Sequence, residues 1–248
     1  PGVPVSTDER PLSRTALLVG GGSESLFTLA QLLDNGDQPL LISLGGPDWA
    51  GSNPEINTIK FTEDQAISRE FGLGLISIRT NFKEIIREPA WQVYMKPGHR
   101  MLFSVLYAPF FMSFVWPVCR HFRIGKIVCG AEVESLNAFA SWAAAHYRAI
   151  SAGVTFDQHL TSLTKYHIVS TLHLKYPALA RHQNSCHFRT DRRWCCACEK
   201  CFRNYFILKN IGVDLAGIEL DEKKILALQQ ELIRQSVDEM MGSSGLRV

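Results

Sequence analysis

The sequence lacks a clear excess of either charge. It has 26 lysine and arginine residues against 24 aspartate and glutamate residues, so the formal net charge is only +2. Proteins that bind nucleic acids usually gather basic side chains on one face, because these side chains neutralise phosphates. We therefore expect no nucleic-acid partner, and tRNA modification is disfavoured as a function.

The sequence also lacks an apolar leader and an even set of cysteines. Residues 1–14 are polar and proline-rich, unlike a secretory signal peptide or an amphipathic presequence. Seven cysteines are an odd number, and a chain of 248 residues is long enough to fold without disulfides. Both observations favour a reducing, cytoplasmic setting. The first residue is Pro1 and not methionine, so we expect the numbering to begin inside a longer protein.

Long apolar runs are scarce. One segment, Met101–Cys119, lies between Arg100 and Arg120 and has about the length that a bilayer requires. It contains Pro109 and Pro117, which remove backbone donors that only neighbouring spans could replace in lipid, and the sequence offers no second span. We expect a buried core helix and no membrane partner, with a membrane span as the alternative.

The part of the chain after Thr15 alternates short apolar runs with helical stretches. This alternation predicts an α/β fold, Rossmann-like, with helices on both faces of a mostly parallel sheet. The expected strands are Thr15–Val19, Leu40–Leu44, Leu75–Arg79 and Lys126–Cys129. The expected helices are Leu26–Leu33, Glu63–Phe71, the run from Met101, Glu134–Tyr147, Phe202–Asn210 and Asp221–Glu239.

The pattern becomes polar and rich in histidine after Ser151. We therefore divide the chain into a nucleotide-binding α/β domain, residues 1–150, and a C-terminal part, residues 151–248. The C-terminal part contains a crowded group of cysteines and a terminal helix, which indicates a smaller subdomain.

A glycine-rich turn follows the first expected strand. Its sequence is Gly20-Gly21-Gly22-Ser23-Glu24-Ser25. Backbone N–H groups and a helix dipole converge where a strand passes into a helix, which favours bound phosphate or pyrophosphate, and the two serine hydroxyls can add donors. The turn lacks the spacing of Walker and dinucleotide-binding motifs. A tight turn without a ligand is the alternative.

Four of the cysteines have the spacing of a metal site. They are Cys186, Cys195, Cys198 and Cys201. Four thiolates this close in sequence can bind one zinc ion tetrahedrally, and they leave no open position for catalysis, so the zinc would be structural. A redox Cys-x-x-Cys pair is the alternative. We assign no catalytic role to the remaining cysteines, which are Cys119, Cys129 and Cys196.

The glycine turn resembles the PP-loop of ATP pyrophosphatases, which usually reads Ser-Gly-Gly-Lys/Met-Asp-Ser after the first strand. Gly20, Ser23 and Glu24 depart from that pattern, because the family has Ser, Lys and Asp there. The resemblance implies a fold of the HUP type, ATP bound on residues 20–25 and Mg²⁺ near the acidic residue.

A second match lies at the end of the fourth expected strand. The segment Gly130-Ala131-Glu132-Val133-Glu134 is similar to the Gly-x-x-x-Asp of the same superfamily. Ligands of open α/β sheets gather at the carboxyl ends of strands, so the resemblance implies that Gly130 and Glu134 contribute to the nucleotide or magnesium site. Acidic residues that merely cap a helix are the alternative.

The order of motifs resembles two branches of the superfamily. The segments Pro97-Gly98-His99-Arg100 and Thr164-Lys165, followed by the cysteines, are similar to 7-cyano-7-deazaguanine synthase, although that family has Arg-Asn where this chain has His99-Arg100. The run Trp194–Cys201 resembles an element of the UDP-N-acetylmuramoyl-L-alanyl-L-glutamate epimerase family. Both branches use ATP to adenylate a substrate carboxylate and release pyrophosphate.

The resemblance implies particular roles for three residues before the cysteines. Arg100 and Lys165 are candidate cations on the attacked phosphate, and His99 is a candidate proton shuttle. Surface cations and a capping histidine are the alternatives.

These inferences together predict an ATP-dependent enzyme, a ligase, synthase or epimerase, that forms AMP and pyrophosphate. Its expected cofactors are ATP, Mg²⁺ and Zn²⁺, and its expected substrate is the carboxylate of a small molecule or peptide. The alternative is a PP-loop protein that binds nucleotide without turnover and acts as a binding or partner subunit. The oligomeric state stays open, with a homodimer as one alternative.

Overall fold

The computed structural model describes residues 12–45, 54–80, 113–130, 153–160, 162–186 and 193–243. The strands are β1 Arg14–Val19, β2 Leu40–Gly45, β3 Leu75–Arg79, β4 Ile124–Gly130 and β5 Thr155–His159. The helices are α1 Ser23–Asp34, α2 Pro54–Glu70, α7 Lys165–Lys175, α8 Pro177–Ala180, α9 Glu199–Asn210, the short η2 Ala216–Ile218 and α10 Glu222–Ser243. Residues 113–122 form a further helix before β4.

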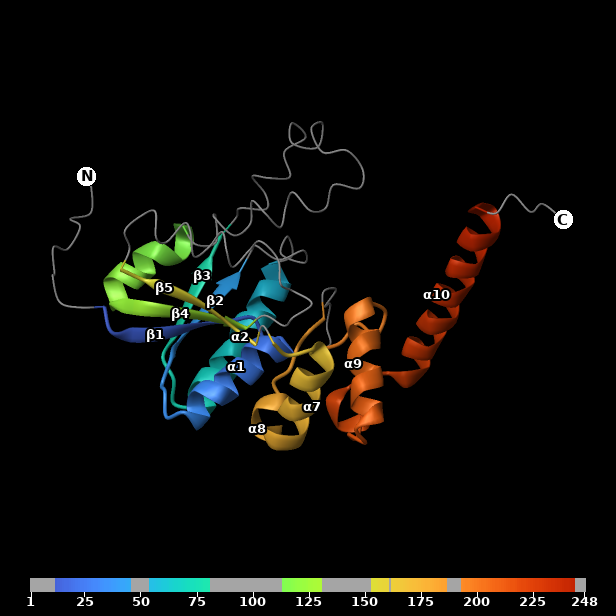
Figure 1. The fold of residues 1–248 in the computed structure, drawn as a ribbon, viewed down its shortest axis with the longest axis horizontal. Helices are drawn as coiled ribbons and strands as arrows, with labels where there is room; N and C mark the ends of the chain where they lie inside the picture. The colour runs from blue at the N-terminus through green and yellow to red at the C-terminus, as the bar shows by residue number, and fades with distance from the viewer. Residues whose placement is uncertain are drawn as a thin grey trace, which may run out of the picture.

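The strands form one five-stranded sheet in the order β3-β2-β1-β4-β5, and every pairing is parallel (Figure 1). The chain adds β2 and β3 on one side of β1 and then places β4 and β5 on the other side. The expected α/β, Rossmann-like fold is therefore confirmed. In such a sheet the point where the strand order reverses, here between β1 and β4, opens a crevice at the carboxyl ends of the strands.

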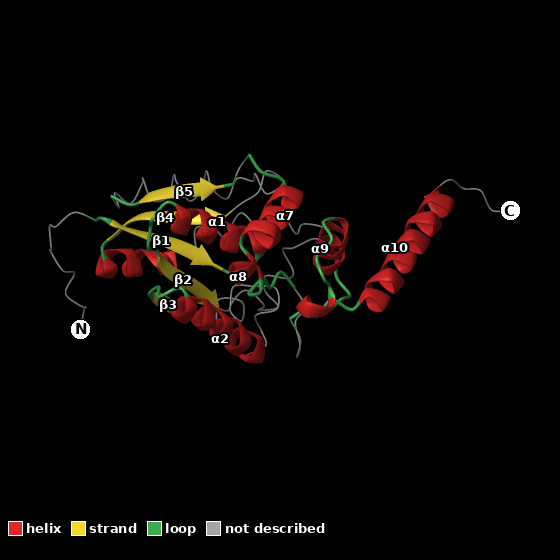
Figure 2. Cartoon of the chain, turned by 90° about the horizontal axis from the view of Figure 1, so that it is seen from below, coloured by secondary structure: helices red, strands yellow, loops and turns green. Residues whose placement is uncertain are grey.

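Helices cover both faces of the sheet. On one face Leu17 of β1 and Leu41 of β2 pack with Leu26 of α1 in a continuous core that also includes residues of α2 and α7. On the other face Ile42 of β2 packs with Val115 of the helix at 113–122. Figures 1 and 2 show the sheet between these layers. All six residues of β2 are buried, and its sequence is apolar apart from Ser43 and does not alternate.

Three helices begin earlier than the sequence pattern predicts, and one of them is α9, which begins at Glu199 and not at Phe202. α1 begins at Ser23 and not at Leu26, because Gly22 is its extended N-cap and the polar residues that follow occupy its first turn. α2 begins at Pro54 and not at Glu63. Proline is accepted in the first turn of a helix, where its missing N–H costs nothing.

The sequence interpretation missed strand β5. Its sequence Thr155–His159 is polar, and the strand lies at the edge of the sheet, paired only with β4 among the described strands. An edge strand buries fewer side chains than a central one, so its apolar signal is weak. The division of the chain at residue 150 stays a prediction, although β5 follows that boundary and joins the sheet.

One expected helix lies wholly outside the described residues, and a second lies partly outside them. The expected helix Glu134–Tyr147 lies wholly outside them, and so does the first part of Met101–Cys119. The described remainder of the second one is helical, and its Val115 and Cys119 are fully buried. Among the described helices, none combines the length and the apolar character that a membrane crossing requires.

The C-terminal helices build a separate core. Trp194, Tyr205, Leu208 and Ile225 pack together with the cysteines at the start of α9. α9 contacts α7 on one side and α10 on the other, and α10 extends away from the sheet (Figure 1). The cysteine group therefore belongs to a small apolar unit that α7 joins to the sheet domain.

Candidate functional site

The glycine turn connects β1 to α1 at the carboxyl edge of the sheet. Gly21 has a φ of +72°, in the left-handed region that favours glycine. The Ser25 hydroxyl donates to the Gly22 carbonyl at 3.0 Å and accepts from the Gly20 N–H at 3.4 Å. The turn is therefore closed against the first turn of α1, and its amides lie at a helix N-terminus.

The two serines of the turn have partners within the protein. Ser23 is fully buried, and its hydroxyl donates to Glu24 Oε2 at 3.3 Å. Ser25 holds the turn itself, through the two hydrogen bonds to Gly20 and Gly22. Both serines thus shape the turn and orient Glu24, and a contact between their hydroxyls and a phosphate stays a prediction.

Gly130 brings the end of β4 into direct contact with α1. A Cβ atom at this position would lie 2.6 Å from the Glu24 carbonyl carbon and oxygen, and 2.8 Å from Thr28 Oγ1. Glycine is therefore required here by the close approach of two backbones. The contact fixes the glycine turn at the reversal point between β1 and β4. Glu134 lies outside the described residues.

Lys165 reaches the turn from the start of α7. The helix is capped by Thr164, whose hydroxyl oxygen accepts the His167 N–H at 3.3 Å. Lys165 Nζ forms an ion pair with the Glu24 carboxylate, and the two side chains are only 5% and 19% exposed. The structure thus brings together two predicted site residues that are 141 positions apart. Arg100 and His99 lie outside the described residues.

A buried polar group beside the turn was not predicted from the sequence. Lys60 of α2 donates to Asp64 Oδ2 at 2.6 Å, to Ser43 Oγ of β2 at 2.6 Å and to the Val19 carbonyl at 3.4 Å. Asp64 is 1% exposed and accepts the Ser43 hydroxyl, while its Oδ1 has no hydrogen-bond partner. The spacing Lys60-x₃-Asp64 is a helical signal, but the helix was expected to begin only at Glu63.

A second unpredicted contact comes from the segment before the cysteines. The Asn184 N–H donates to the Gly21 carbonyl at 2.6 Å, and Asn184 Nδ2 donates to Glu63 Oε2 of α2 at 2.5 Å. Asn184 Oδ1 is buried without a partner. No motif in the sequence marks Asn184, because a single asparagine in a loop has many uses.

Gln183 anchors this segment to the helices of the C-terminal part. Its Nε2 donates to Asn204 Oδ1 of α9 at 2.8 Å and to Ser185 Oγ at 3.1 Å, and its Oε1 lies 2.6 Å from His173 Nε2 of α7. Burial lowers the pKa of His173, which favours a neutral imidazole that donates to Gln183.

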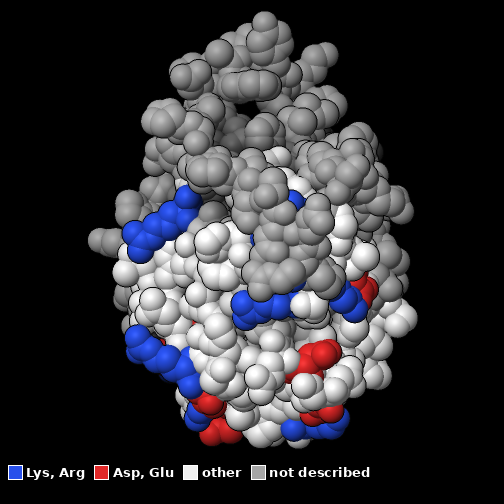
Figure 3. All heavy atoms as spheres, turned by 90° about the vertical axis from the view of Figure 1, so that its left-hand side faces the viewer, with Lys and Arg blue, Asp and Glu red and all other residues white. Residues whose placement is uncertain are grey.

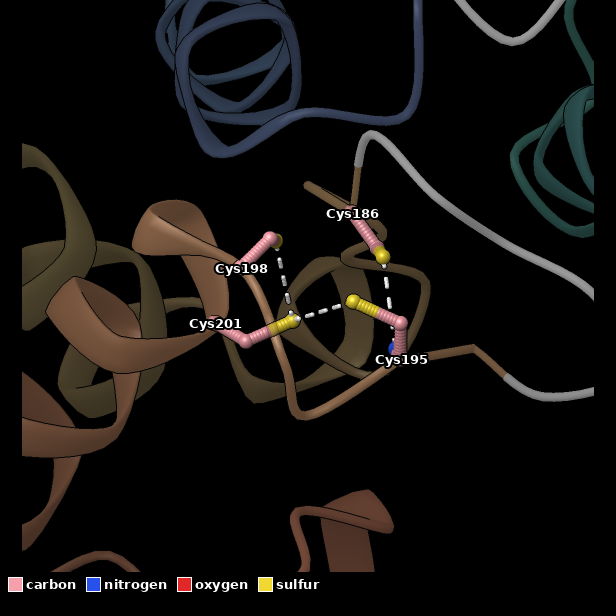
Figure 4. A group of neighbouring side chains, drawn as sticks. All are labelled: Cys186, Cys195, Cys198 and Cys201. Carbon is pink, nitrogen blue, oxygen red and sulfur yellow. Dashed lines mark hydrogen bonds between the residues drawn. The ribbon is translucent and has the colours of Figure 1, made fainter. Parts of the chain in front are cut away.

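The four predicted metal ligands converge on one point. The Sγ atoms of Cys186, Cys195, Cys198 and Cys201 all lie within 4.8 Å of one another (Figure 4). The Cys198–Cys201 and Cys195–Cys201 sulfur distances are 3.5 and 3.8 Å. Tetrahedral zinc with Zn–S bonds of about 2.3 Å holds its sulfurs about 3.8 Å apart. The described geometry therefore fits a single metal ion, and the prediction that these four cysteines form one group is confirmed.

The surroundings of these thiols favour their neutral form. Burial, followed by the neighbouring thiols, raises the pKa of Cys195 to about 12, and hydrogen bonds with Cys186 and Cys198 raise the pKa of Cys201. Backbone N–H groups of Cys195 and Ala197 donate to the sulfurs of Cys186 and Cys195 at 3.3 and 3.4 Å. A bound cation would favour the thiolates, since four such charges cannot otherwise stand this close.

Cys196 is turned away from the group. It has a left-handed φ of +55°, and its sulfur lies 3.7 Å from the Trp194 carbonyl and accepts the Asp221 N–H at 3.2 Å. Burial raises the pKa of Cys119 and of Cys129 to about 12 each. These three thiols are therefore packing groups, as the sequence predicts.

Charges of both signs lie on the described surface. On the face shown in Figure 3, basic side chains stand in separate groups, several of them beside acidic ones. Lys126 and Asp157, which belong to neighbouring strands, form one exposed pair at 2.8 Å. The expectation that nucleic acid is not a partner stays a prediction.

Comparison with known proteins gives a likeness to solved structures only. No family model matches the sequence, and no curated protein matches it. Among solved structures, the chain is similar to "U34-tRNA thiolase NcsA from Methanococcus maripaludis with its [4Fe-4S] cluster", with 14% sequence identity and a TM-score of 0.43. The match covers 67% of this chain and 58% of the thiolase chain, so it spans less than two thirds of that protein.

Proposed function

We propose that this protein is an ATP-dependent enzyme of the PP-loop class that adenylates a carboxylate of a small molecule or peptide. In this reaction a carboxylate oxygen attacks the α-phosphorus of ATP, the bond to the bridging oxygen breaks, and pyrophosphate leaves. The observation that carries the proposal is the glycine turn at the reversal point of a parallel sheet, with Lys165 and Glu24 beside it.

The turn supplies donors for the leaving pyrophosphate. The first amides of a helix have no acceptor within the helix, and the dipole of α1 favours an anion at the same place. Gly20, Gly21 and Gly22 carry no side chains, so a phosphate can approach their backbone closely. These groups would stabilise the charge that develops on the pyrophosphate oxygens.

Lys165 and Glu24 would have separate roles once the substrate binds, Lys165 at a phosphate and Glu24 at Mg²⁺. The Lys165 ammonium would exchange the Glu24 carboxylate for a phosphate oxygen, because Glu24 belongs to the turn and Lys165 is paired with it. The Glu24 carboxylate would then hold Mg²⁺, whose preferred ligands are oxygens. Arg100 as a second cation, His99 as a proton shuttle and Glu134 as a magnesium ligand remain part of the proposal.

The cysteine group is proposed to hold zinc with a structural role. Four thiolates complete a tetrahedral shell and leave no position for water or substrate. The short sulfur distances support one ion, because the thiolates of an iron–sulfur cluster bind separate irons and stand farther apart. Elemental analysis of purified protein and its visible absorbance would distinguish zinc from iron.

A second candidate is a protein that binds nucleotide without turning it over. Ser23 stands where PP-loop enzymes have lysine, and Lys165 is already paired with Glu24. Pyrophosphate release from Mg-ATP, measured with a panel of carboxylates, separates the candidates. An enzyme gives release that depends on one carboxylate class, whereas a binding protein gives nucleotide affinity and no pyrophosphate.

The remaining proposals concern partners and location. The balanced charge of +2 supports the absence of a nucleic-acid partner, the odd number of cysteines supports a cytoplasmic location, and Pro109 and Pro117 support the absence of a membrane partner. Filter binding with tRNA across salt concentrations tests this, because phosphate contacts give a steep salt dependence. Light scattering tests whether the protein is a homodimer.

A further inference from the structure

We infer that Asn184 is a positioning residue through which the four-cysteine centre fixes the glycine turn. The Asn184 N–H donates to the Gly21 carbonyl at 2.6 Å, and Cys186, one of the four cysteines, follows two positions later. We call residues 183–186 the connecting segment. The inference deepens the proposed function and rests on it only where pyrophosphate binding is measured.

The connecting segment is buried and is not a surface loop. Gln183, Asn184 and Ser185 are 1%, 8% and 7% exposed. Gln183 bonds to α9 through Asn204, which is fully buried and lies on the same helix as Cys201. A displacement at the cysteine end therefore cannot be absorbed by solvent-exposed backbone within the segment.

At its other end the segment touches the glycine turn with backbone and side chain. A Cβ atom on Gly21 would stand 3.6 Å from Asn184 Cβ, which is ordinary van der Waals contact. Asn184 Nδ2 also donates to Glu63, so the same residue ties the turn to α2. Glycine has the greatest backbone freedom of all residues, so a run of three needs outside contacts to hold one conformation.

A bound metal ion would act on the connecting segment through Cys186. Cys186 comes from the segment, while Cys198 and Cys201 belong to the beginning of α9. A metal shared by these sulfurs fastens the segment to α9. The Cys186 sulfur also accepts the Cys195 N–H at 3.3 Å, a weaker contact than a bond to a metal ion. The turn is therefore expected to be more ordered in the zinc-loaded protein than in the zinc-free protein.

Hydrogen exchange of the full chain, with zinc bound and after chelation, tests this directly. Loss of zinc is expected to speed exchange of the Asn184 amide and of the amides in residues 20–26 by about fivefold to tenfold, the effect of losing one ordering hydrogen bond. Amides of β2 and β3 serve as the internal control and should not change. Faster exchange around residues 195–201, with residues 20–26 unchanged, would overturn the inference.

If chelation unfolds the chain, two variants at position 184 test the same inference with zinc bound. Asn184→Pro removes the N–H that Gly21 accepts, while Asn184→Ala keeps the N–H and the Cβ but loses the bond to Glu63. With zinc bound, the proline variant should show faster exchange at residues 20–26 and unchanged zinc content, and the alanine variant should resemble the wild type at the turn. Equal exchange in both variants and the wild type contradicts the inference.

Inorganic pyrophosphate gives a second readout of the same coupling. Its affinity should fall by about fivefold to tenfold on zinc removal in the wild type, and zinc removal should have no further effect in Asn184→Pro. If wild-type protein binds no pyrophosphate, the proposed function fails, and the exchange experiment still decides the role of Asn184. If pyrophosphate binds with the same affinity in all forms, the coupling fails and the proposed function stands.

Discussion

Lys165, the first residue of α7, forms a buried ion pair with Glu24, in the first turn of α1. The pair joins the segment before the cysteines to the glycine turn, and at 5% exposure the lysine is almost removed from water. Such a pair is costly to desolvate, and breaking it by removing one partner leaves an uncompensated charge. It therefore offers a test that separates a structural from a catalytic contribution.

Replacing Lys165 with methionine should reduce the free energy of unfolding by about 3 kcal/mol, because Glu24 is left partly buried without its cation. The double variant Lys165→Met/Glu24→Gln should recover most of that stability and still release no pyrophosphate. Urea denaturation and a pyrophosphate assay measure the two effects. Lys175→Met on the same helix, in an exposed pair with Asp34, is the matched control and should leave stability unchanged. Full activity in the double variant would remove Lys165 from the reaction.

Adding one methyl group at Gly130 should separate α1 from β4. Gly130→Ala places a carbon 2.6 Å from the Glu24 backbone, so the free energy of unfolding should fall by about 1–3 kcal/mol. Nucleotide affinity should fall with it, because the glycine turn moves. The control is Gly20→Ala, where no atom lies within 4 Å of the new Cβ. Equal stability of the two variants, measured by thermal unfolding, would argue against close contact of the backbones.

The cysteine group should bind about one zinc ion per chain. Cys201→Ser should abolish tight zinc binding and lower the melting temperature by about 10 °C or more, because the ion joins the segment of Cys186 to the run of residues 195–201. Cys196→Ser is the matched control, since its sulfur faces the Asp221 N–H and not the other four. Elemental analysis with calorimetry measures both outcomes. Zinc retained in Cys201→Ser, or lost in Cys196→Ser, contradicts the assignment.

The partly buried His173 should make stability fall as the pH falls. Burial lowers its pKa below the ordinary value of 6.5, so the unfolded chain binds a proton before the folded one does. Stability is therefore complete above about pH 6.5 and is lost as the pH falls from there towards the lower folded pKa. The variant His173→Gln can still donate to Gln183 and should lose less stability between pH 8 and about 5. Equal losses in the two zinc-loaded proteins would mean that His173 does not titrate across this range.

The sheet and the metal group could be predicted because their signals are local. β3 matches its expected bounds, since a short, mostly apolar run between turns is sufficient to define a strand. The four cysteines can be recognised as a metal site from their spacing alone. β5 could not be found in the same way, because Thr155–His159 is a polar edge strand whose evidence is its pairing with β4.

The contacts that complete the site depend on residues that the chain brings together only after folding. Asp64, on α2, meets Ser43 of β2, and Asn184 meets Gly21, although no periodicity links either pair. Each contact is a hydrogen bond by a common residue type, which has many uses in proteins. Only the three-dimensional arrangement distinguishes these residues from other polar residues of the same kind.

The central claim is that the glycine turn between β1 and α1 holds the phosphates of ATP. Titration calorimetry of zinc-loaded protein with Mg-ATP, at two temperatures, tests it most directly. We expect binding at one site per chain, with an affinity that is weaker in Gly130→Ala than in the wild type. No heat at either temperature, or an unchanged affinity in Gly130→Ala, would contradict the claim.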